Sequence, residues 1–267
     1  MILPKTCDPR FHVWNKTWHA PYGRKRLKQY IPSSWECTIP ALKLVGPFGV
    51  QPNSSSRIHE YPWAFYATHL ERGMSAVDLG GGFSGFPFVL QKSGLKVTNV
   101  DPFLDYGPHK HYKVSPGRVI EAMNVAFRTS VDLIHGTIEQ ANFPSESMDR
   151  VYCISAIEHM PLDAIHCILR EVKRILKPNG LFVLTIDLFL NLTPFSDRSS
   201  NEFGTNASVF DLVQDSGLSM ITGKPQELYG FPAFNPREVL ANLEQYFIAP
   251  NSYPVLSQAV VLSKAIP

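Results

Sequence analysis

Residues 76–85 read AVDLGGGFSG, an apolar, strand-like run that ends in three consecutive glycines. Asp101 ends the next such run, nineteen positions after Gly82. A glycine-rich turn after a buried strand lets backbone N–H groups approach a ligand closely, and a carboxylate at the tip of the neighbouring strand can accept hydrogen bonds from two ribose hydroxyls. The stretch therefore predicts a nucleotide-binding turn within a βαβ unit.

The type of nucleotide depends on the residues around the glycines. Gly80, Gly82 and Gly85 satisfy the G-x-G-x-x-G pattern of dinucleotide-binding proteins, so a nicotinamide cofactor is one interpretation. Asp78 precedes the first glycine by two residues, and a carboxylate at a strand end suits a cationic amine better than a pyrophosphate. S-adenosylmethionine carries such an amine and no phosphate, and we favour it as the cofactor.

Strand-like and helical patterns alternate along the chain from residue 75 onward. Strands are expected at residues 75–79, 95–100, 131–135, 150–155 and 181–187, with a short strand near residue 220 and a final one at 259–263. Between the fourth and fifth of these strands, apolar residues recur at helical spacing up to Leu176, and Asn179-Gly180 is expected to end that helix. This alternation predicts an α/β fold with a parallel sheet covered by helices on both faces.

Two regions depart from the alternating pattern. Residues 1–56 are rich in Trp, Tyr, His and Pro and have no sustained period, so they are interpreted as an N-terminal extension or cap packed on the main domain at residues 57–267. Residues 188–235 begin with a loosely patterned stretch after the fifth strand, and we interpret this region as a lid-like insertion.

The composition limits the kinds of partner and compartment. A formal charge of +2, from 25 basic and 23 acidic residues, gives no large field for a nucleic acid or an anionic membrane. The four cysteines have no C-x-x-C spacing, which favours reduced thiols over a disulfide framework or a metal site. No run approaches the roughly 20 apolar residues that span a bilayer. We expect a soluble, cytoplasmic protein with no metal; its oligomeric state is left open.

Four motifs occur in an order typical of one family. They are VDLGGGFSG at 77–85, VDP at 100–102, GTIEQANFP at 136–144 followed by MDRVY at 148–152, and SAIEHM at 155–160 followed by LREVKRILKPNG at 169–180. Together they resemble the class I S-adenosylmethionine-dependent methyltransferases of the methyltransferase type 11 family. The resemblance implies a Rossmann-like, seven-stranded, mostly parallel sheet with an antiparallel final strand.

The resemblance also implies roles for the residues of the first two motifs. The backbone at Gly80, Gly81 and Gly82 would pass under the methionine part of the cofactor. Asp78 would orient the amine, directly or through water, and Asp101 would bind the ribose hydroxyls.

The third and fourth motifs carry further cofactor candidates. Thr137 stands where the family usually has an aspartate that contacts the adenine amine; its hydroxyl can accept a hydrogen bond but brings no charge. Ile138 is expected to pack against the adenine. Ser155, at the end of the fourth strand, is expected to line the cofactor pocket, although a strand-end serine can also be purely structural.

His159 is the candidate catalytic residue because it follows the fourth strand where an acceptor would arrive, and an imidazole can take a proton from a hydroxyl. Packing at a helix entry is the alternative role for His159. His109, His111 and His135 are weaker candidates.

These observations favour an enzyme that transfers a methyl group from S-adenosylmethionine to a small-molecule acceptor, a sugar or a secondary metabolite. One alternative is a noncatalytic relative that binds S-adenosylmethionine or a partner protein through the same fold, because this chemistry needs no fixed catalytic side chain. Another is a nicotinamide-dependent oxidoreductase. Methylation of nucleic acid is disfavoured, since the chain has no strongly basic face and no run resembling Asn/Asp-Pro-Pro-Tyr.

Overall fold

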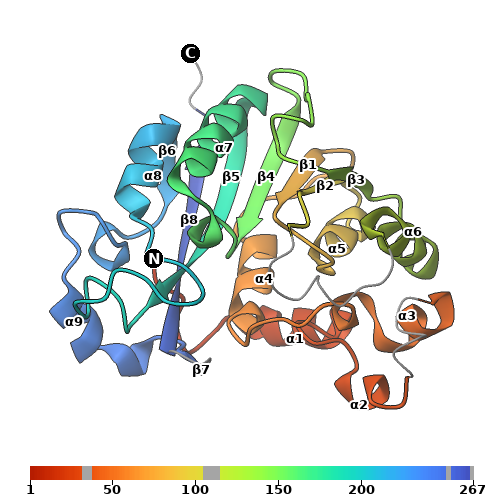
Figure 1. Cartoon of the computed structure of the whole chain (residues 1–267), viewed down its shortest axis with the longest axis horizontal. Helices are drawn as coiled ribbons and strands as arrows, with labels where there is room; N and C mark the ends of the chain where they lie inside the picture. Colours follow the sequence, from red (N-terminus) through yellow and green to blue (C-terminus); the bar gives the residue numbers. More distant parts are fainter. Residues whose placement is uncertain (32–37, 105–114, 251–253, 265–267) are drawn as a thin grey trace.

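An eight-stranded β-sheet runs through the centre of the structure, a computed structural model that describes residues 1–31, 38–104, 115–250 and 254–264 (Figure 1). Seven strands lie in the order β3-β2-β1-β4-β5-β8-β6, and the two-residue β7 pairs with β8. The strands are β1 (Ser75–Leu79), β2 (Lys96–Asp101), β3 (Asp132–His135), β4 (Met148–Ile154), β5 (Leu176–Phe189), β6 (Ser219–Thr222), β7 (Ala249–Pro250) and β8 (Pro254–Ser263).

The strand directions follow the expected pattern. Strands β1 to β5 pair in parallel, whereas β8 is antiparallel to β5, to β6 and to β7. The prediction of a mostly parallel Rossmann-like sheet with an antiparallel final strand is confirmed. Because β1 lies between β2 and β4, the strand order reverses there, and ligands of such sheets bind at the carboxyl ends of the strands beside that reversal.

Helices cover both faces of the sheet. They are α1 (Pro9–Trp18), α2 (Lys25–Lys28), α3 (Ile39–Val45), α4 (Arg57–Tyr66), α5 (Phe86–Lys92), α6 (Pro116–Phe127), α7 (Leu162–Ile175), α8 (Val209–Ser216) and α9 (Pro236–Ala241), with 3-10 turns η2 (Pro47–Gly49), η4 (Ile157–His159), η5 (Pro225–Glu227) and η6 (Leu243–Gln245). In the part of the chain that the structure describes, no helix has both the length and the apolar character needed to cross a membrane.

The two largest apolar clusters of the core lie on opposite faces of the sheet. Along β4, Tyr152 belongs to the cluster that contains residues of α1, α3, α4, α5 and α6, whereas Val151 and Cys153 belong to the cluster of α7 and α8. This alternation follows from the two-residue period of a strand. Both faces being apolar explains why the central strands are continuous hydrophobic runs.

The end of α7 differs from the sequence expectation. The helix stops at Ile175, and Leu176 is already extended, fully buried and paired with Met148 of β4. Asn179, with a φ of +61°, lies in the irregular first part of β5 and does not end the helix. Pairing with the neighbouring strand therefore overrides the local stop signal.

The N-terminal extension folds into short helices that contact the rest of the chain. Leu3 donates its N–H to the Ser257 carbonyl of β8 (2.9 Å), and α1 packs on α4. Figure 1 shows these helices near the carboxyl ends of the central strands, with α4 beside the end of β4.

The interval interpreted as a lid contributes a helix and a strand to the main body. In the interval interpreted as a lid, α8 packs on α7 and β6 pairs with β8; the domain boundaries and the lid stay predictions. Cys7, Cys153 and Cys167 are free thiols. Cys37, His109 and His111 lie outside the described residues.

Candidate functional site

The glycine-rich turn, Gly80 to Gly82, follows β1 directly. Gly80 and Gly82 have φ values of +70° and +54°, which side chains rarely tolerate. A Cβ on Gly81 would collide with Asp78 Oδ2 and would lie 2.8 Å from Asn99 Oδ1. Glycine is therefore required at all three positions, at two by backbone conformation and at Gly81 by the polar side chains that face it.

Asp78 is a buried carboxyl group at the end of β1, with 2% of its surface exposed. Burial, together with the nearby Asp101, raises its pKa to about 8. Asn99 Oδ1, which faces the same glycine, is also buried and has no hydrogen-bond partner among the described residues. A buried acid beside an unsatisfied amide oxygen fits an ammonium group, which donates several hydrogen bonds and brings the missing positive charge. The residues present thus fit the amine of S-adenosylmethionine.

Asp101 ends β2 and binds the turn. Its Oδ2 accepts a hydrogen bond from Gly82 N (2.8 Å) and its Oδ1 accepts one from Phe103 N (2.7 Å). A carboxylate has about four acceptor positions, so each oxygen keeps one for a ligand hydroxyl. The contacts make Asp101 a structural support of the turn as well as the candidate ribose ligand.

The N-terminal extension and α4 hold the other side of the turn. Gln51 Oε1 accepts a hydrogen bond from Phe83 N (2.7 Å), and the Tyr61 hydroxyl lies 3.1 Å from Ser84 Oγ. A Cβ on Gly85 would lie 2.8 Å from the backbone of Pro47. These contacts join sequence segments more than twenty residues apart, and no local pattern around Gln51 signals them.

The two adenine candidates differ in environment. Ile138 is buried in the cluster that also contains Leu79 and Val100, near the ends of β1 and β2. Thr137 is exposed, and its backbone N–H donates a hydrogen bond to Gln140 Oε1 (2.8 Å). Ile138 is thus close to the predicted pocket, whereas Thr137 lies at the surface; both contacts with adenine stay predictions.

Ser155 follows β4 in a left-handed conformation, with a φ of +41°. Its hydroxyl lies 2.8 Å from Glu60 Oε1 and 3.0 Å from Asp187 Oδ1, and its carbonyl accepts a hydrogen bond from Arg57 Nη2 (3.2 Å). A strained non-glycine residue is retained where the surrounding contacts determine it. Ser155 therefore joins α4, β4 and β5 at one point.

The hydroxyl between two carboxyl groups fixes where a proton resides. Ser155 has a single hydroxyl hydrogen, so it donates to one carboxyl group and must accept from the other. Burial, with Glu158 and Glu60 nearby, raises the pKa of Asp187 to about 8. Burial would also raise the pKa of Glu60, but its ion pair with Arg57 and its hydrogen bonds lower it. Asp187 is thus the group that holds the proton.

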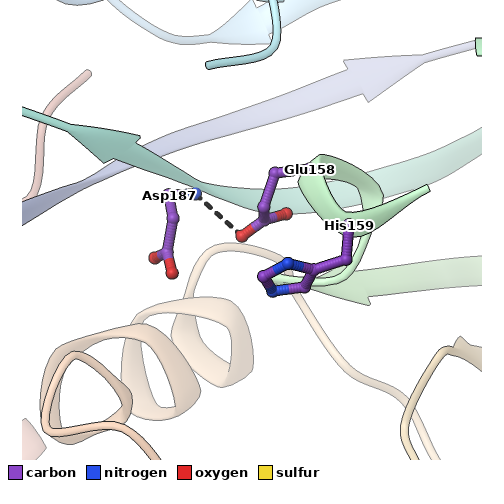
Figure 2. Close-up of side chains that lie close together, drawn as sticks. All are labelled: Glu158, His159 and Asp187. Carbon is purple, nitrogen blue, oxygen red and sulfur yellow. Dashed lines mark hydrogen bonds between the residues drawn. The ribbon is translucent and has the colours of Figure 1, made fainter. Parts of the chain in front are cut away.

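Glu158 and His159 lie on η4, next to Asp187 (Figure 2). Glu158 Oε1 accepts a hydrogen bond from Asp187 N (3.0 Å), and burial raises the pKa of Glu158 to about 7. The exposed His159 ring has its Nδ1 hydrogen-bonded to the Phe203 carbonyl. A carbonyl only accepts, so Nδ1 carries the hydrogen and, in the neutral ring, Nε2 has the free lone pair.

We call Glu60, Glu158 and Asp187 the acidic cluster. The sequence analysis missed all three, together with Arg57. One signal was present for Asp187, because it lies close to the carboxyl end of its strand, as Asp78 and Asp101 do. Glu60 and Arg57 sit in an aromatic-rich helix, where nothing in the sequence indicates that they meet β4 and β5.

Comparison with known proteins identifies one family in this region. Residues 77–184 match the family model described as Methyltransferase domain, an interval that runs from β1 into β5. It contains Asp78, the glycine-rich turn, Asp101 and Glu158.

Curated relatives match part of the chain. A sterol 24-C-methyltransferase of Yarrowia lipolytica is 28% identical over 46% of this chain and 30% of its own length. The sterol 24-C-methyltransferase ERG6B of Gibberella zeae is 30% identical over 60% of this chain and 41% of its own. The ribosomal RNA large subunit methyltransferase M of Methylococcus capsulatus is 32% identical over 42% of this chain and 35% of its own length. The chain spans less than half the length of each of these relatives.

Solved structures share the fold at low identity. An S-adenosylmethionine-dependent methyltransferase from Mesorhizobium loti has a TM-score of 0.50 and 16% identity, covering 76% of this chain and 97% of that one. The cyclase SpnF has a TM-score of 0.52 and 14% identity, and the match covers 78% of this chain and 81% of the cyclase. Since a cyclase has this fold, the activity of a protein of this kind must be argued from its site.

Proposed function

Because residues 77–184 form a methyltransferase domain of the class I, type 11 family, we propose that this protein transfers a methyl group from S-adenosylmethionine to a small-molecule acceptor, a sugar or a secondary metabolite. The observation that carries the proposal is the buried Asp78 carboxyl beside the unsatisfied Asn99 Oδ1. This pair suits the cofactor's ammonium and would be unfavourable beside a pyrophosphate.

The cofactor would lie across the ends of β1 and β2. Asp78 and Asn99 would bind its ammonium group, Asp101 would accept hydrogen bonds from its ribose hydroxyls, and Ile138 would pack against its adenine. Ser155, at the end of β4, would line the pocket on the acceptor side. The nicotinamide alternative loses support, since the family match names a methyltransferase and Asp78 would repel a pyrophosphate.

The cofactor's sulfonium makes its methyl group electrophilic, so the protein's main tasks are to orient the acceptor and to exclude water. The acidic cluster and Arg57 at the ends of β4 and β5 are available to orient polar groups of the acceptor. His159 Nε2 is the proposed proton acceptor for a hydroxyl, because the Phe203 carbonyl holds the hydrogen on Nδ1.

A small acceptor is favoured over RNA by charge. The side chains that converge beyond the end of β4 are three acids and Arg57, and they offer no excess of positive charge to a phosphate backbone. The nearly balanced net charge of +2 supplies no compensating field. The proposed compartment is the cytoplasm, supported by the cysteine spacing.

Calorimetry tests the cofactor half of the proposal. S-adenosylmethionine and its demethylated product should bind the purified protein below millimolar concentration. Asp78→Asn should weaken binding at least about tenfold, since it removes the charge opposite the ammonium. Asp132→Asn, at the exposed amino end of β3, is the matched control and should bind normally. If neither ligand binds at millimolar concentration, the proposal fails.

A labelled methyl group tests the acceptor. Incubation with S-adenosylmethionine carrying a labelled methyl should label small molecules of a cell extract and leave RNA unlabelled. Label in RNA would contradict the acceptor class. Cofactor binding with no transfer to any fraction would favour the noncatalytic alternative.

A further inference from the structure

Three side chains of metal-ligand type meet at the carboxyl ends of β4 and β5. One donor atom from each of Glu158, His159 and Asp187 lies within 4.8 Å of the other two. Figure 2 shows the Glu158 carboxyl group directed toward the space between the other two side chains. Donors bound to one ion at 2.0–2.2 Å are at most about 4.4 Å apart, so a small rotation of the exposed His159 side chain would bring all three into range.

The Glu158 carboxyl group is only half satisfied. Its Oε1 accepts the Asp187 N–H, but Oε2 is buried and has no hydrogen-bond partner in the described part of the chain. The side chain is 97% buried, since 3% of the residue is exposed. A buried carboxylate oxygen without a partner is unfavourable. The unpartnered Oε2 of Glu158 is a separate observation from the closeness of the three side chains. It indicates a ligand that the protein chain does not supply.

The orientation of His159 suits metal binding. A metal-ligating histidine commonly donates its other ring N–H to a backbone carbonyl, which fixes the tautomer and the ring plane. His159 Nδ1 has this contact with the Phe203 carbonyl, so Nε2 has its lone pair free.

The charges of the cluster would balance one divalent cation. Arg57 forms an ion pair with Glu60, which offsets one of the three acids of the acidic cluster. Among the described residues, Arg57 is also the cation whose charge opposes the raised pKa values of Glu158 and Asp187. When an ion takes the place of the proton on Asp187, Glu158 and Asp187 carry two negative charges, equal to the charge of one divalent ion.

We infer that Glu158, His159 and Asp187 form a binding site for a divalent metal ion. Two carboxylates and one imidazole suit Mn²⁺ or Zn²⁺, since carboxylates alone would favour Mg²⁺ or Ca²⁺ and imidazole favours the later metals. The site depends on nothing at the ends of β1 and β2. It differs from the expectation of no metal that the cysteine spacing gave.

The ion changes the role of His159. As a ligand, Nε2 no longer accepts a proton from the acceptor. An acceptor hydroxyl coordinated to the ion loses its proton to solvent more readily than a free one. This consequence rests on the proposed methyl transfer; metal binding itself does not.

Titration with Mn²⁺ tests the site without any cofactor. The signal of free Mn²⁺ in electron paramagnetic resonance should fall as the purified protein is added, with saturation at one ion per chain, and Zn²⁺ should displace the bound Mn²⁺. Glu158→Gln keeps an oxygen for the Asp187 N–H, and it should weaken Mn²⁺ binding at least about tenfold, as should Asp187→Asn. Glu121→Gln, on the exposed face of α6, is the matched control and should bind as the unchanged protein does.

Two outcomes would overturn the inference: no Mn²⁺ or Zn²⁺ binding at millimolar concentration, or binding that Glu158→Gln and Asp187→Asn leave unchanged. Circular dichroism spectra and cofactor calorimetry of the same variants separate loss of the ion from loss of the fold. Asp78→Asn should lose cofactor affinity and retain Mn²⁺, so failure of the metal site and failure of the proposed function give different results.

Discussion

At the residue scale, the site depends on one position where a side chain has no room. Gly81 faces the carboxyl group of Asp78 and the amide oxygen of Asn99 across the turn. The missing Cβ leaves space for these two polar groups at the point where the cofactor amine is proposed to bind. Burial at this point, together with the nearby Asp101, also raises the pKa of Asp78 to about 8.

Gly81→Ala should weaken cofactor binding at least about tenfold, because the new methyl group would displace Asp78 or Asn99 from the positions that bind the ammonium. Calorimetry with S-adenosylmethionine measures the effect. Gly117→Ala, in α6, is the matched control, since a Cβ there meets nothing within 4 Å. Equal affinities of the two variants would contradict the assignment of the turn.

The buried Asp78 should make the ligand-free protein less stable as pH rises. Its pKa is raised to about 8 from 3.8, so the folded state keeps a proton that the unfolded chain loses between those values. Stability from this group is present at low pH and is lost as pH rises from about 4 to about 8. Relative to Asp78→Asn, the free energy of unfolding should fall by at most about 1.4 kcal/mol per pH unit.

Urea unfolding between about pH 5 and pH 8 measures this dependence. The comparison with Asp78→Asn isolates one carboxyl group, because Glu158 and Asp187 also have raised pKa values and contribute equally to both proteins. Parallel pH profiles of the two proteins would show that Asp78 is not protonated in the folded state.

At the scale of elements, the cofactor turn is held by a segment that precedes the methyltransferase domain match. Gln51 and Tyr61 contact Phe83 and Ser84, which follow the turn directly. Arg57 and Glu60 contact Ser155 at the end of β4. One short stretch of chain thus supports both the proposed cofactor side and the proposed acceptor side.

Gln51→Ala should weaken cofactor binding several-fold and lower stability by about 1 kcal/mol, because the Phe83 N–H in the turn loses its acceptor. Calorimetry and thermal unfolding measure the two effects. Gln91→Ala on α5 removes a comparable side-chain hydrogen bond, to Ser130, and should leave cofactor affinity unchanged. A normal affinity of Gln51→Ala would show that the turn keeps its shape without the extension.

Arg57→Met should destabilise the fold by about 3–5 kcal/mol, because Glu60 would remain buried without its partner. Adding Glu60→Gln removes the stranded charge, so the double variant should be more stable than Arg57→Met alone. Urea unfolding of the two single variants and the double variant gives the coupling energy. Additive losses would mean that the ion pair contributes no coupling.

At the scale of the whole molecule, the sheet separates two cores. Residues of β5 alternate between them: Val183 faces the cluster of α5 and α6, while Phe182 and Leu184 face that of α7 and α8. Both cores fix the strands whose carboxyl ends carry the functional side chains.

Leu184→Ala should cost about 2–5 kcal/mol of unfolding free energy, since the residue is 1% exposed and its loss leaves a cavity against α7 and α8. Leu162→Ala on α7, where the side chain is 65% exposed, is the matched control and should change stability little. Urea unfolding measures both. A small loss in Leu184→Ala would mean that this core is loosely packed.

The sequence by itself determined the parts of this protein that depend on neighbouring residues. Periodic apolar runs fix each central strand, and the expected strand at 75–79 is β1 of the structure. Three glycines in a row leave few alternatives to a tight turn, and acids at strand ends place Asp78 and Asp101 beside it, because parallel strands bring their carboxyl ends to one edge.

The tertiary structure decided what depends on distant residues. Ser155 contacts Glu60, 95 positions away, and Asp187, 32 positions away, because α4 packs against both β4 and β5. Helix α7 ends at Ile175, before the expected stop at Asn179-Gly180, because Leu176 pairs with Met148 of β4. Raised pKa values need burial and neighbouring charges, which exist only once the chain has folded. The strand pattern could place Asp187 near a strand end, but no local pattern could bring it together with Glu60 and Glu158.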